Sequence, residues 1–225
     1  MTAILQDGVS VKVESEVIRR YPATGVYGIL CEPGRPGLYD FQALLERERS
    51  RLRAPLNELK DDPVIRAFRD FYWRIGIDPT KQRPASEALI RRMLQGGQIP
   101  SINYIVDAGN IASIRTKVPI GLYDYDKVKG PLRLSMSKGG EPFVDVTGKE
   151  GRTKEEIVLK DDLGILHIFP HRDCFRTRIT EETRRVLVLS CRVLGVTEDL
   201  CKQAAWEVVR VLNQLSGDLS LEMVR

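Results

Sequence analysis

The feature that most restricts the fold is a change of sequence pattern at Pro119. Before this residue, apolar side chains recur at helical spacing in several long segments. After it, short apolar runs are separated by glycine, proline and aspartate, which is typical of strands joined by turns. Helical segments followed by strand-rich segments in one chain favour an α+β fold. We therefore expect a curved mixed or antiparallel sheet, or a partial barrel, packed with helices.

Start and stop signals bound the helical segments. Asp62 is a typical cap, and Pro63 is a typical first residue of the helix that follows it. Thr197 is expected to cap the last helix of the chain. A further helix is expected to end at Thr116, where Pro119 to Gly121 would form a tight turn. The other helices are expected over residues 39–54, 63–76, 86–97 and 197–216.

Strands are expected where short apolar or alternating runs lie between turn signals. Lys160 to Gly164 has the composition of a hairpin turn, and it joins two such runs. The segments expected to form strands are residues 9–13, 24–32, 131–136, 141–148, 157–159, 165–169 and 185–194.

Length and composition limit the class of protein. A chain of 225 residues, 42% hydrophobic and 29% charged, is expected to form a single globular domain over residues 1–225. The first residues are too polar for a signal peptide, and no apolar run reaches membrane length. We therefore expect a cytoplasmic protein with no membrane partner. Its four cysteines are expected to be reduced, since none belongs to a C-x-x-C pair.

Several common types of site are disfavoured. The sequence contains no P-loop, G-x-G-x-x-G, EF-hand, kinase or G-x-S-x-G motif, and no cofactor is expected. His167 and His171 have the spacing of helical metal ligands, but Pro170 between them would break a helix. No metal site is therefore expected. Asp173 follows His171 closely, yet neighbours in sequence rarely point at one another, so this pair does not indicate a catalytic triad.

Two groups of cations could contact nucleic acid. The first surrounds the start of the helix after Pro84, where free backbone donors would suit a phosphate group; its alternative is a solvated helix face. The second is a pair of arginines that would share one face of a strand, which suits a nucleic-acid backbone or a strand edge protected by charge. The candidate RNA-binding residues are Lys81, Arg83, Arg91, Arg92, Arg176 and Arg178.

The segment from Ile102 to Val128 mixes polar side chains into a pattern typical of a protein core. Either these side chains hydrogen-bond to each other and hold the backbone, or they line a recess where a ligand binds. For Asp107 we favour the first interpretation. Asn110 suits both, because an amide presents a donor and an acceptor at once.

This segment also carries a resemblance to a known family. "VDAGNIASIRTKVPIGLYDYDKV" (Val106–Val128) and "ITEETRRVLVL" (Ile179–Leu189) are similar to the tRNA-editing domain of the bacterial phenylalanyl-tRNA synthetase β subunit. That domain is formed by the third and fourth modules of the subunit. "IDPTKQRPASEALIRR" (Ile77–Arg92) resembles the freestanding relatives of the domain. The resemblance covers about residues 24–195, with the C-terminal helix packed on that part.

The resemblance implies a β-rich core with added helices and a pocket for the aminoacylated 3′ end of tRNA. It implies hydrolysis of the ester that joins a wrong amino acid to tRNA, carried out in trans by a freestanding protein. Asn110 matches the family pattern. Three positions depart from it: the family's His falls on Gly121, its Glu on Leu189, and a Thr on Gly109. Backbone donors near Gly121 and the Phe169–Arg172 turn could replace them.

The candidate site follows from the resemblance and from the donors near His171. The residues expected to take part in catalysis are Asn110, Thr116, His171, Arg172 and Asp173. The residues expected to contact the substrate are Ser113, Arg115, Pro119, Ile120, Gly121, Tyr123, Thr177 and Leu189.

Three functions remain open at this point. The first is a hydrolase of misacylated tRNA, the second a non-catalytic tRNA-binding or RNA-binding module, and the third a binding protein for an amino acid-like small molecule. The modest net charge of +4 permits an anionic partner without requiring one. The sequence leaves open which amino acid or tRNA is recognised, and the oligomeric state.

Overall fold

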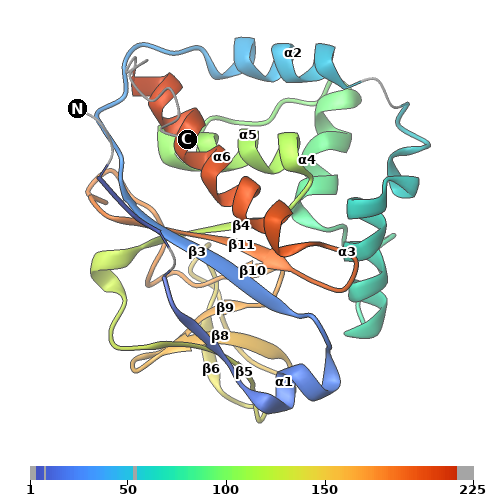
Figure 1. The fold of residues 1–225 in the computed structure, drawn as a ribbon, viewed down its shortest axis with the longest axis vertical. Coiled ribbons are helices and arrows are strands. Elements are labelled where there is room, and N and C mark those ends of the chain that lie inside the picture. Colours follow the sequence, from blue (N-terminus) through green and yellow to red (C-terminus); the bar gives the residue numbers. More distant parts are fainter. Residues whose placement is uncertain (1–3, 8, 53–54, 217–225) are drawn as a thin grey trace.

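The protein is described by a computed structural model that covers residues 4–7, 9–52 and 55–216 (Figure 1). The remaining residues of the expected 1–225 domain lie outside the described part. The helices in this part are α1 (Ser15–Arg20), α2 (Phe41–Arg51), α3 (Pro63–Arg74), α4 (Ala85–Leu94), α5 (Tyr104–Thr116) and α6 (Glu198–Ser216).

The strands of the described part form two larger sheets and a hairpin. Sheet A is antiparallel, with the order β1 (Ile4–Asp7), β3 (Gly25–Glu32), β11 (Val186–Arg192) and β4 (Ile120–Asp124). Sheet B is mixed, with the order β10 (Arg172–Asp173), β9 (Gly164–Ile168), β8 (Ile157–Asp161), β5 (Leu132–Met136) and β2 (Val11–Val13). The hairpin pairs β6 (Pro142–Val144) with β7 (Glu150–Arg152). Both sheets are open, and the predicted α+β fold with mixed and antiparallel sheets is confirmed.

Sheet A lies in the middle of the molecule, and both of its faces are covered. Helices α5 and α6 pack on one face, and sheet B lies on the other side (Figure 1). Successive side chains of a strand point to opposite faces, so β11 contributes to both layers. Val186 and Val188 are buried in the layer with the helices. Leu187 and Leu189 are buried in the layer between the two sheets, where α3 adds Phe68 and Phe71.

The predicted helix starts are confirmed. The Asp62 carboxylate accepts hydrogen bonds from the backbone N–H groups of Val64 and Ile65, at 3.0 and 3.3 Å, and Pro63 is the first residue of α3. Thr197 accepts a bond of 3.2 Å from the N–H of Leu200 in α6. Such caps satisfy N–H groups that have no partner inside the helix. The predicted hairpin also forms, with β8 and β9 on either side of its turn.

The predicted turn from Pro119 to Gly121 is wrong. The chain reverses earlier, at Lys117, whose φ of 64° places it in the left-handed region directly after α5. Gly121 then lies inside strand β4, opposite Leu189 of β11. A distant strand therefore decided this stretch, because β11 supplies hydrogen-bond partners that proline and glycine alone do not reveal.

The fold corrects the expected placement of two arginines and confirms the expected state of the cysteines. Arg176 and Arg178 follow β10 in a loop and do not share a strand face. All four cysteines are free and buried, as predicted. No helix in the described part of the chain combines the length and apolar character needed to cross a membrane.

Candidate functional site

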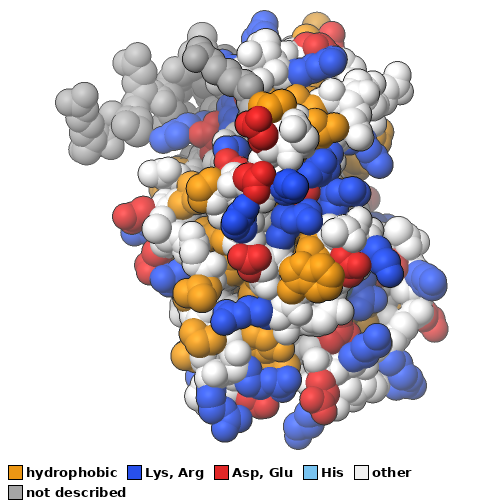
Figure 2. Space-filling view, turned by 90° about the vertical axis from the view of Figure 1, so that its right-hand side faces the viewer, with side chains coloured by type: hydrophobic (Ala, Val, Ile, Leu, Met, Phe, Trp, Pro, Cys, Tyr) orange, Lys and Arg blue, Asp and Glu red, His pale blue; other side chains and the backbone are white. Residues whose placement is uncertain are grey.

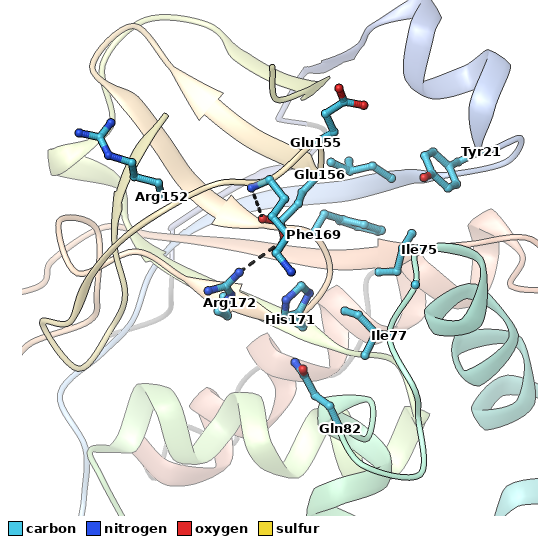
Figure 3. Close-up of a pocket in the computed structure, with 13 residues that line it drawn as sticks. Tyr21, Ile75, Ile77, Gln82, Arg152, Glu155, Glu156, Phe169, His171 and Arg172 are labelled. Carbon is cyan, nitrogen blue, oxygen red and sulfur yellow. Dashed lines mark hydrogen bonds and ion pairs between the residues drawn. The ribbon is translucent and has the colours of Figure 1, made fainter. Parts of the chain in front are cut away.

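A pocket with a volume of about 490 Å³ opens beside the turn that joins β9 to β10 (Figure 3). One wall comes from this turn, a second from β7 and the segment before β8, and a third from the loop that follows α3. Its lining residues are Tyr21, Ile75, Gly76, Ile77, Gln82, Arg152, Lys154, Glu155, Glu156, Ile157, Phe169, His171 and Arg172.

The pocket has an apolar side and a charged side. Ile75, Ile77 and Phe169 supply apolar surface, whereas Arg152 and Arg172 lie across from them (Figure 3). Arg172 reaches the Glu156 carboxylate at 3.4 Å, and its side chain is 44% exposed. Because a guanidinium carries five N–H donors, this single long contact leaves most of them available to a ligand. The pocket can therefore bind a group that is partly apolar and carries a negative charge or a carbonyl oxygen.

His171 lines this pocket, as a half-buried side chain. Burial, followed by repulsion from His167 and Arg172, lowers the pKa of His171 from 6.5 to about 3, although Asp173 acts in the opposite direction. The ring nitrogen Nδ1 is buried and has no hydrogen-bond partner among the described residues. His171 is therefore neutral at pH 7, and it can accept or donate one hydrogen bond without carrying a charge.

This pKa predicts how stability changes with pH. Between about pH 6.5 and 3 the unfolded chain binds a proton at position 171 that the folded chain does not bind. The stability contributed by neutral His171 is therefore complete above about pH 6.5 and is lost as the pH falls towards 3. We expect His171→Gln to be less sensitive to acid than the wild-type protein. Urea unfolding of both proteins at mildly acidic and neutral pH measures this, and identical pH dependence would contradict it.

Asp173 joins a second group of polar side chains behind the turn. Its Oδ1 accepts a hydrogen bond of 2.8 Å from the Tyr123 hydroxyl, and the same oxygen lies 2.9 Å from His167 Nδ1. Burial opposes the charge on Asp173, but His167 and the two hydrogen bonds outweigh it, so the pKa of Asp173 is lowered. An ionised carboxylate only accepts, so His167 donates through Nδ1. Its Nε2 is buried and unpartnered within the described part.

Tyr123 occupies the space where the sequence predicted a recess. A Cβ atom added at Gly121 would lie 2.3 Å from the Tyr123 hydroxyl oxygen. Leu189, directly opposite Gly121, is only 2% exposed. Burial raises the pKa of Tyr123 well above its ordinary value, so its hydroxyl remains protonated and donates to Asp173. The expected recess beside the Pro119–Gly121 segment is therefore filled by this side chain.

Helix α5 lies on the other face of sheet A. Gly109 packs so closely on Leu122 that an added Cβ would lie 2.6 Å from its Cδ1, and Leu122 belongs to the layer with the helices. Asn110 is half-buried on this helix, away from the β9–β10 turn. The structure thus does not bring Asn110, Gly121 and His171 to one cavity, and their predicted roles stay predictions.

The other residues expected in the site have local partners. Ser113 donates to the Val118 carbonyl at 2.7 Å, and Thr116 donates to the Ala112 carbonyl at 2.8 Å. Arg115 links three helices through ion pairs of 2.7 Å with Glu48 of α2 and 2.8 Å with Glu207 of α6.

Backbone groups fix three of the remaining expected site residues. The Pro119 carbonyl accepts from Cys191 N–H at 3.0 Å, and the Thr177 carbonyl accepts from Asp124 N–H at 2.8 Å. Ile120 lies in β4 and is half-buried. Asp107 has a supporting role, but it holds the segment before α5 and not the turn expected after it: its carboxylate accepts from Tyr39 at 2.9 Å and from the Ile102 N–H at 3.1 Å.

The six candidate RNA-binding residues fall into two classes. Lys81, Arg83 and Arg92 are exposed at the two ends of α4. Arg91 donates to the buried Glu87 at 2.7 Å. The first turn of α4 therefore already holds a carboxylate, which weakens the predicted phosphate site there.

The two arginines after β10 also have partners. Arg176 bonds the buried Asp161 at 2.8 Å and the Lys127 carbonyl at 2.6 Å. Arg178 lies 3.4 Å over the Phe175 ring.

Sequence reasoning missed His167 as the partner of Asp173 and missed most walls of the pocket. Only the pairing of β10 with β9 reveals this partner, because it places Asp173 opposite His167. That register depends on the turn at Pro170, and the short β10 has too few residues to be recognised alone. Among the described residues, no group of three or more His, Cys, Asp or Glu side chains is arranged to hold a metal ion.

Comparison with known proteins identifies a family model and several relatives that this chain matches. The model of the B3/4 domain family matches residues 67–210, which is more than half of the chain. The phenylalanine–tRNA ligase beta subunit of Bartonella quintana (strain Toulouse) is 28% identical over 194 residues, covering 80% of this chain and 24% of that protein. The same subunit of Bartonella henselae is 31% identical over 110 residues, covering 48% of this chain and 14% of that protein.

One solved structure that matches is an N-terminal fragment of the phenylalanyl-tRNA synthetase beta subunit from Pyrococcus horikoshii. It has a TM-score of 0.46 and 14% identity, over 93% of this chain and 52% of that chain. By the coverages of 24% and 14% given above, the chain spans about a quarter or less of the length of the two Bartonella subunits it matches.

Proposed function

Because this chain belongs to the B3/4 domain family, we propose that it acts on aminoacylated tRNA, hydrolysing in trans the ester of a wrongly attached amino acid. The relatives it resembles are beta subunits of a phenylalanine–tRNA ligase, whose substrate is tRNA by name. The chain matches only a small part of those subunits, so the reaction proposed is limited to what its own pocket and surface can support.

The observation that carries the proposal is the pocket at the β9–β10 turn. It combines an apolar side, the neutral imidazole of His171 and the accessible guanidinium of Arg172 in a volume of about 490 Å³. An aminoacyl ester on the terminal ribose of a tRNA carries groups that such a pocket can bind: an amino acid side chain, a carbonyl oxygen and the anionic phosphates of the tRNA backbone. The match favours an ester substrate over a purely apolar ligand.

Each residue then has a chemical task. Water attacks the ester carbonyl, the carbonyl oxygen gains negative charge, and the ribose oxygen leaves with the electron pair and takes a proton. Arg172 would donate hydrogen bonds to the oxygen that gains charge. His171 would orient the attacking water, because a pKa of about 3 makes its ring a weak base but a good hydrogen-bond partner. The neighbouring ribose hydroxyl of the substrate would relay the proton, because it can accept the proton that water loses and pass its own proton to the ribose oxygen that leaves.

The Tyr123–Asp173–His167 group would support the turn from behind. Its hydrogen bonds hold Asp173, which comes directly after Arg172 and two residues after His171. These three side chains are positioning residues in this proposal, since the pocket itself is lined by His171 and Arg172.

The proposal is tested with a panel of tRNAs carrying wrong amino acids. At catalytic concentrations of the protein, at least one member of the panel is expected to lose its aminoacyl ester faster than in buffer alone. If the whole panel stays intact, the proposed reaction is wrong. Binding of tRNA without hydrolysis would instead indicate an RNA-binding module, and an amino acid-like ligand retained through purification would indicate a small-molecule binding protein.

A further inference from the structure

Trp73 stands out on the surface of α3. Its side chain is 56% exposed, whereas Phe68, Phe71 and Tyr72 of the same helix are at most 3% exposed. It lies in the last turn of the helix, beside Arg74. Burying an aromatic ring of this size contributes more to stability than burying almost any other side chain. An indole left in solvent on a helix is therefore a candidate contact residue.

Two hollows flank this helix face. The first, about 330 Å³, is lined by Trp73 together with the cations Lys60, Arg66 and Arg69 and two aspartates. The second, about 520 Å³, is lined by Arg66 and Arg74 and also by Asp70, one of those two aspartates. The exposed Leu194 also lines the second hollow. The outer face of α3 therefore carries an accessible aromatic ring with cations on both sides of it. The second hollow adds apolar surface through Leu194.

The surrounding charge has the sign that attracts phosphate groups. Between Lys60 and Arg92 the sequence contains eight Lys and Arg residues and five Asp and Glu residues, so most of the chain's net charge of +4 lies in this segment. Figure 2 shows the side of the molecule that carries α3 and α4, where a hydrophobic patch is bordered by Lys and Arg side chains and also by some Asp and Glu side chains.

The acidic residues on this face reduce its positive charge only in part, although the exposed Asp70 lines both hollows. Asp61 is paired with Arg66. Buried Glu87 is enclosed by Arg69 and Arg91. Since one carboxylate contact occupies few of the N–H groups of an arginine, Arg66 keeps donors for a phosphate. Lys60 and Arg74 are exposed.

These features together fit single-stranded nucleic acid better than an acidic protein segment. Unpaired bases stack on aromatic side chains, and the phosphates of the same strand contact neighbouring Lys and Arg residues. A duplex buries its base faces and could not use Trp73. An acidic peptide would use the cations and leave the indole without a partner.

We propose that the outer face of α3 binds single-stranded RNA, with Trp73 stacking on a base and Arg66 and Arg74 contacting phosphates. The proposal deepens the function argued above and rests on it for the choice of RNA. It adds an RNA-binding face that lies outside the pocket and includes residues that sequence analysis did not single out.

The test measures RNA binding without any ester. The second tryptophan, Trp206, is replaced by phenylalanine so that the fluorescence reports Trp73 alone. A short single-stranded RNA oligonucleotide is expected to quench this fluorescence, and a blunt duplex of the same sequence much less. For the variants at position 73, binding is followed by the fluorescence anisotropy of a dye-labelled RNA instead. Trp73→Ala is expected to weaken binding of the single strand about tenfold and Trp73→Phe less, and binding is expected to weaken as salt is raised. Leu163→Ala, another exposed apolar residue, is the matched control and keeps wild-type affinity.

Three outcomes overturn the proposal: unchanged affinity in Trp73→Ala, equal affinity for single strand and duplex, or equally tight binding of a polyglutamate peptide. These outcomes are independent of ester hydrolysis. A protein that hydrolyses aminoacyl-tRNA but binds RNA equally well without Trp73 refutes this inference alone. A protein that needs Trp73 for RNA binding but hydrolyses nothing refutes only the proposed reaction.

Discussion

Replacing Arg172 by alanine is expected to lower the rate of ester hydrolysis about a hundredfold, while Asn110→Ala stays close to the wild-type rate. Arg172 lines the pocket, reaches Glu156 at 3.4 Å and lies 5.8 Å from the centroid of the Phe143 ring, so most of its N–H donors stay available. Removing a donor to the oxygen that gains charge typically costs this factor in enzymes that cleave acyl groups. Asn110 lies on α5, on the opposite face of sheet A, and would not touch a substrate in this pocket.

The measurement is the first-order loss of aminoacyl ester from the tRNA that the wild-type protein hydrolyses best. Arg133→Ala is the matched control, because Arg133 pairs with the exposed Asp162 at 2.9 Å and does not line the pocket. Arg172→Lys keeps the charge but not the planar donor fork, so an intermediate rate is expected. The reverse pattern, with Asn110→Ala inactive and Arg172→Ala active, would move the site to α5 and β4.

Replacing Glu87 by glutamine is expected to lower the free energy of unfolding by about 3 kcal/mol. Glu87 is completely buried in the first turn of α4. Its carboxylate accepts bonds of 3.0 and 3.1 Å from Arg69 of α3 and 2.7 Å from Arg91. The two arginine side chains are only 18% and 19% exposed, so without the carboxylate two like charges would face each other with little water.

Denaturation by urea measures this loss for Glu87→Gln. The matched control is Glu46→Gln on α2, where a 70% exposed glutamate pairs with Arg49 at 3.5 Å. Exposed pairs of this kind contribute about 0–1 kcal/mol, so the control should be almost as stable as the wild type. If Glu87→Gln and Glu46→Gln lose the same small amount of stability, the buried ion pairs do not hold α3 to α4. In that case apolar packing would account for the contact.

The α+β class and the main helices followed from local patterns. Asp62 and Pro63 start α3 as expected, and Thr197 caps α6, because a helix start depends on a few neighbouring residues. The β8–β9 hairpin could be recognised for the same reason, since its turn and both strands are contiguous. The resemblance in the segment from Val106 to Val128 indicated the family to which residues 67–210 were then matched.

Only the tertiary structure decided how distant residues meet. Gly121 became part of a strand because β11 pairs with it, and Tyr123 then filled the space beside it. Asp173 contacts His167 because the register of β10 and β9 places the two residues opposite each other. The pocket is formed by three separate segments of the chain. Local sequence sets the propensity of a segment, whereas pairing register and packing depend on contacts between residues far apart in the chain. The helices and hairpin were therefore determined by the sequence pattern, and the candidate site by the way the two sheets and α3 pack together.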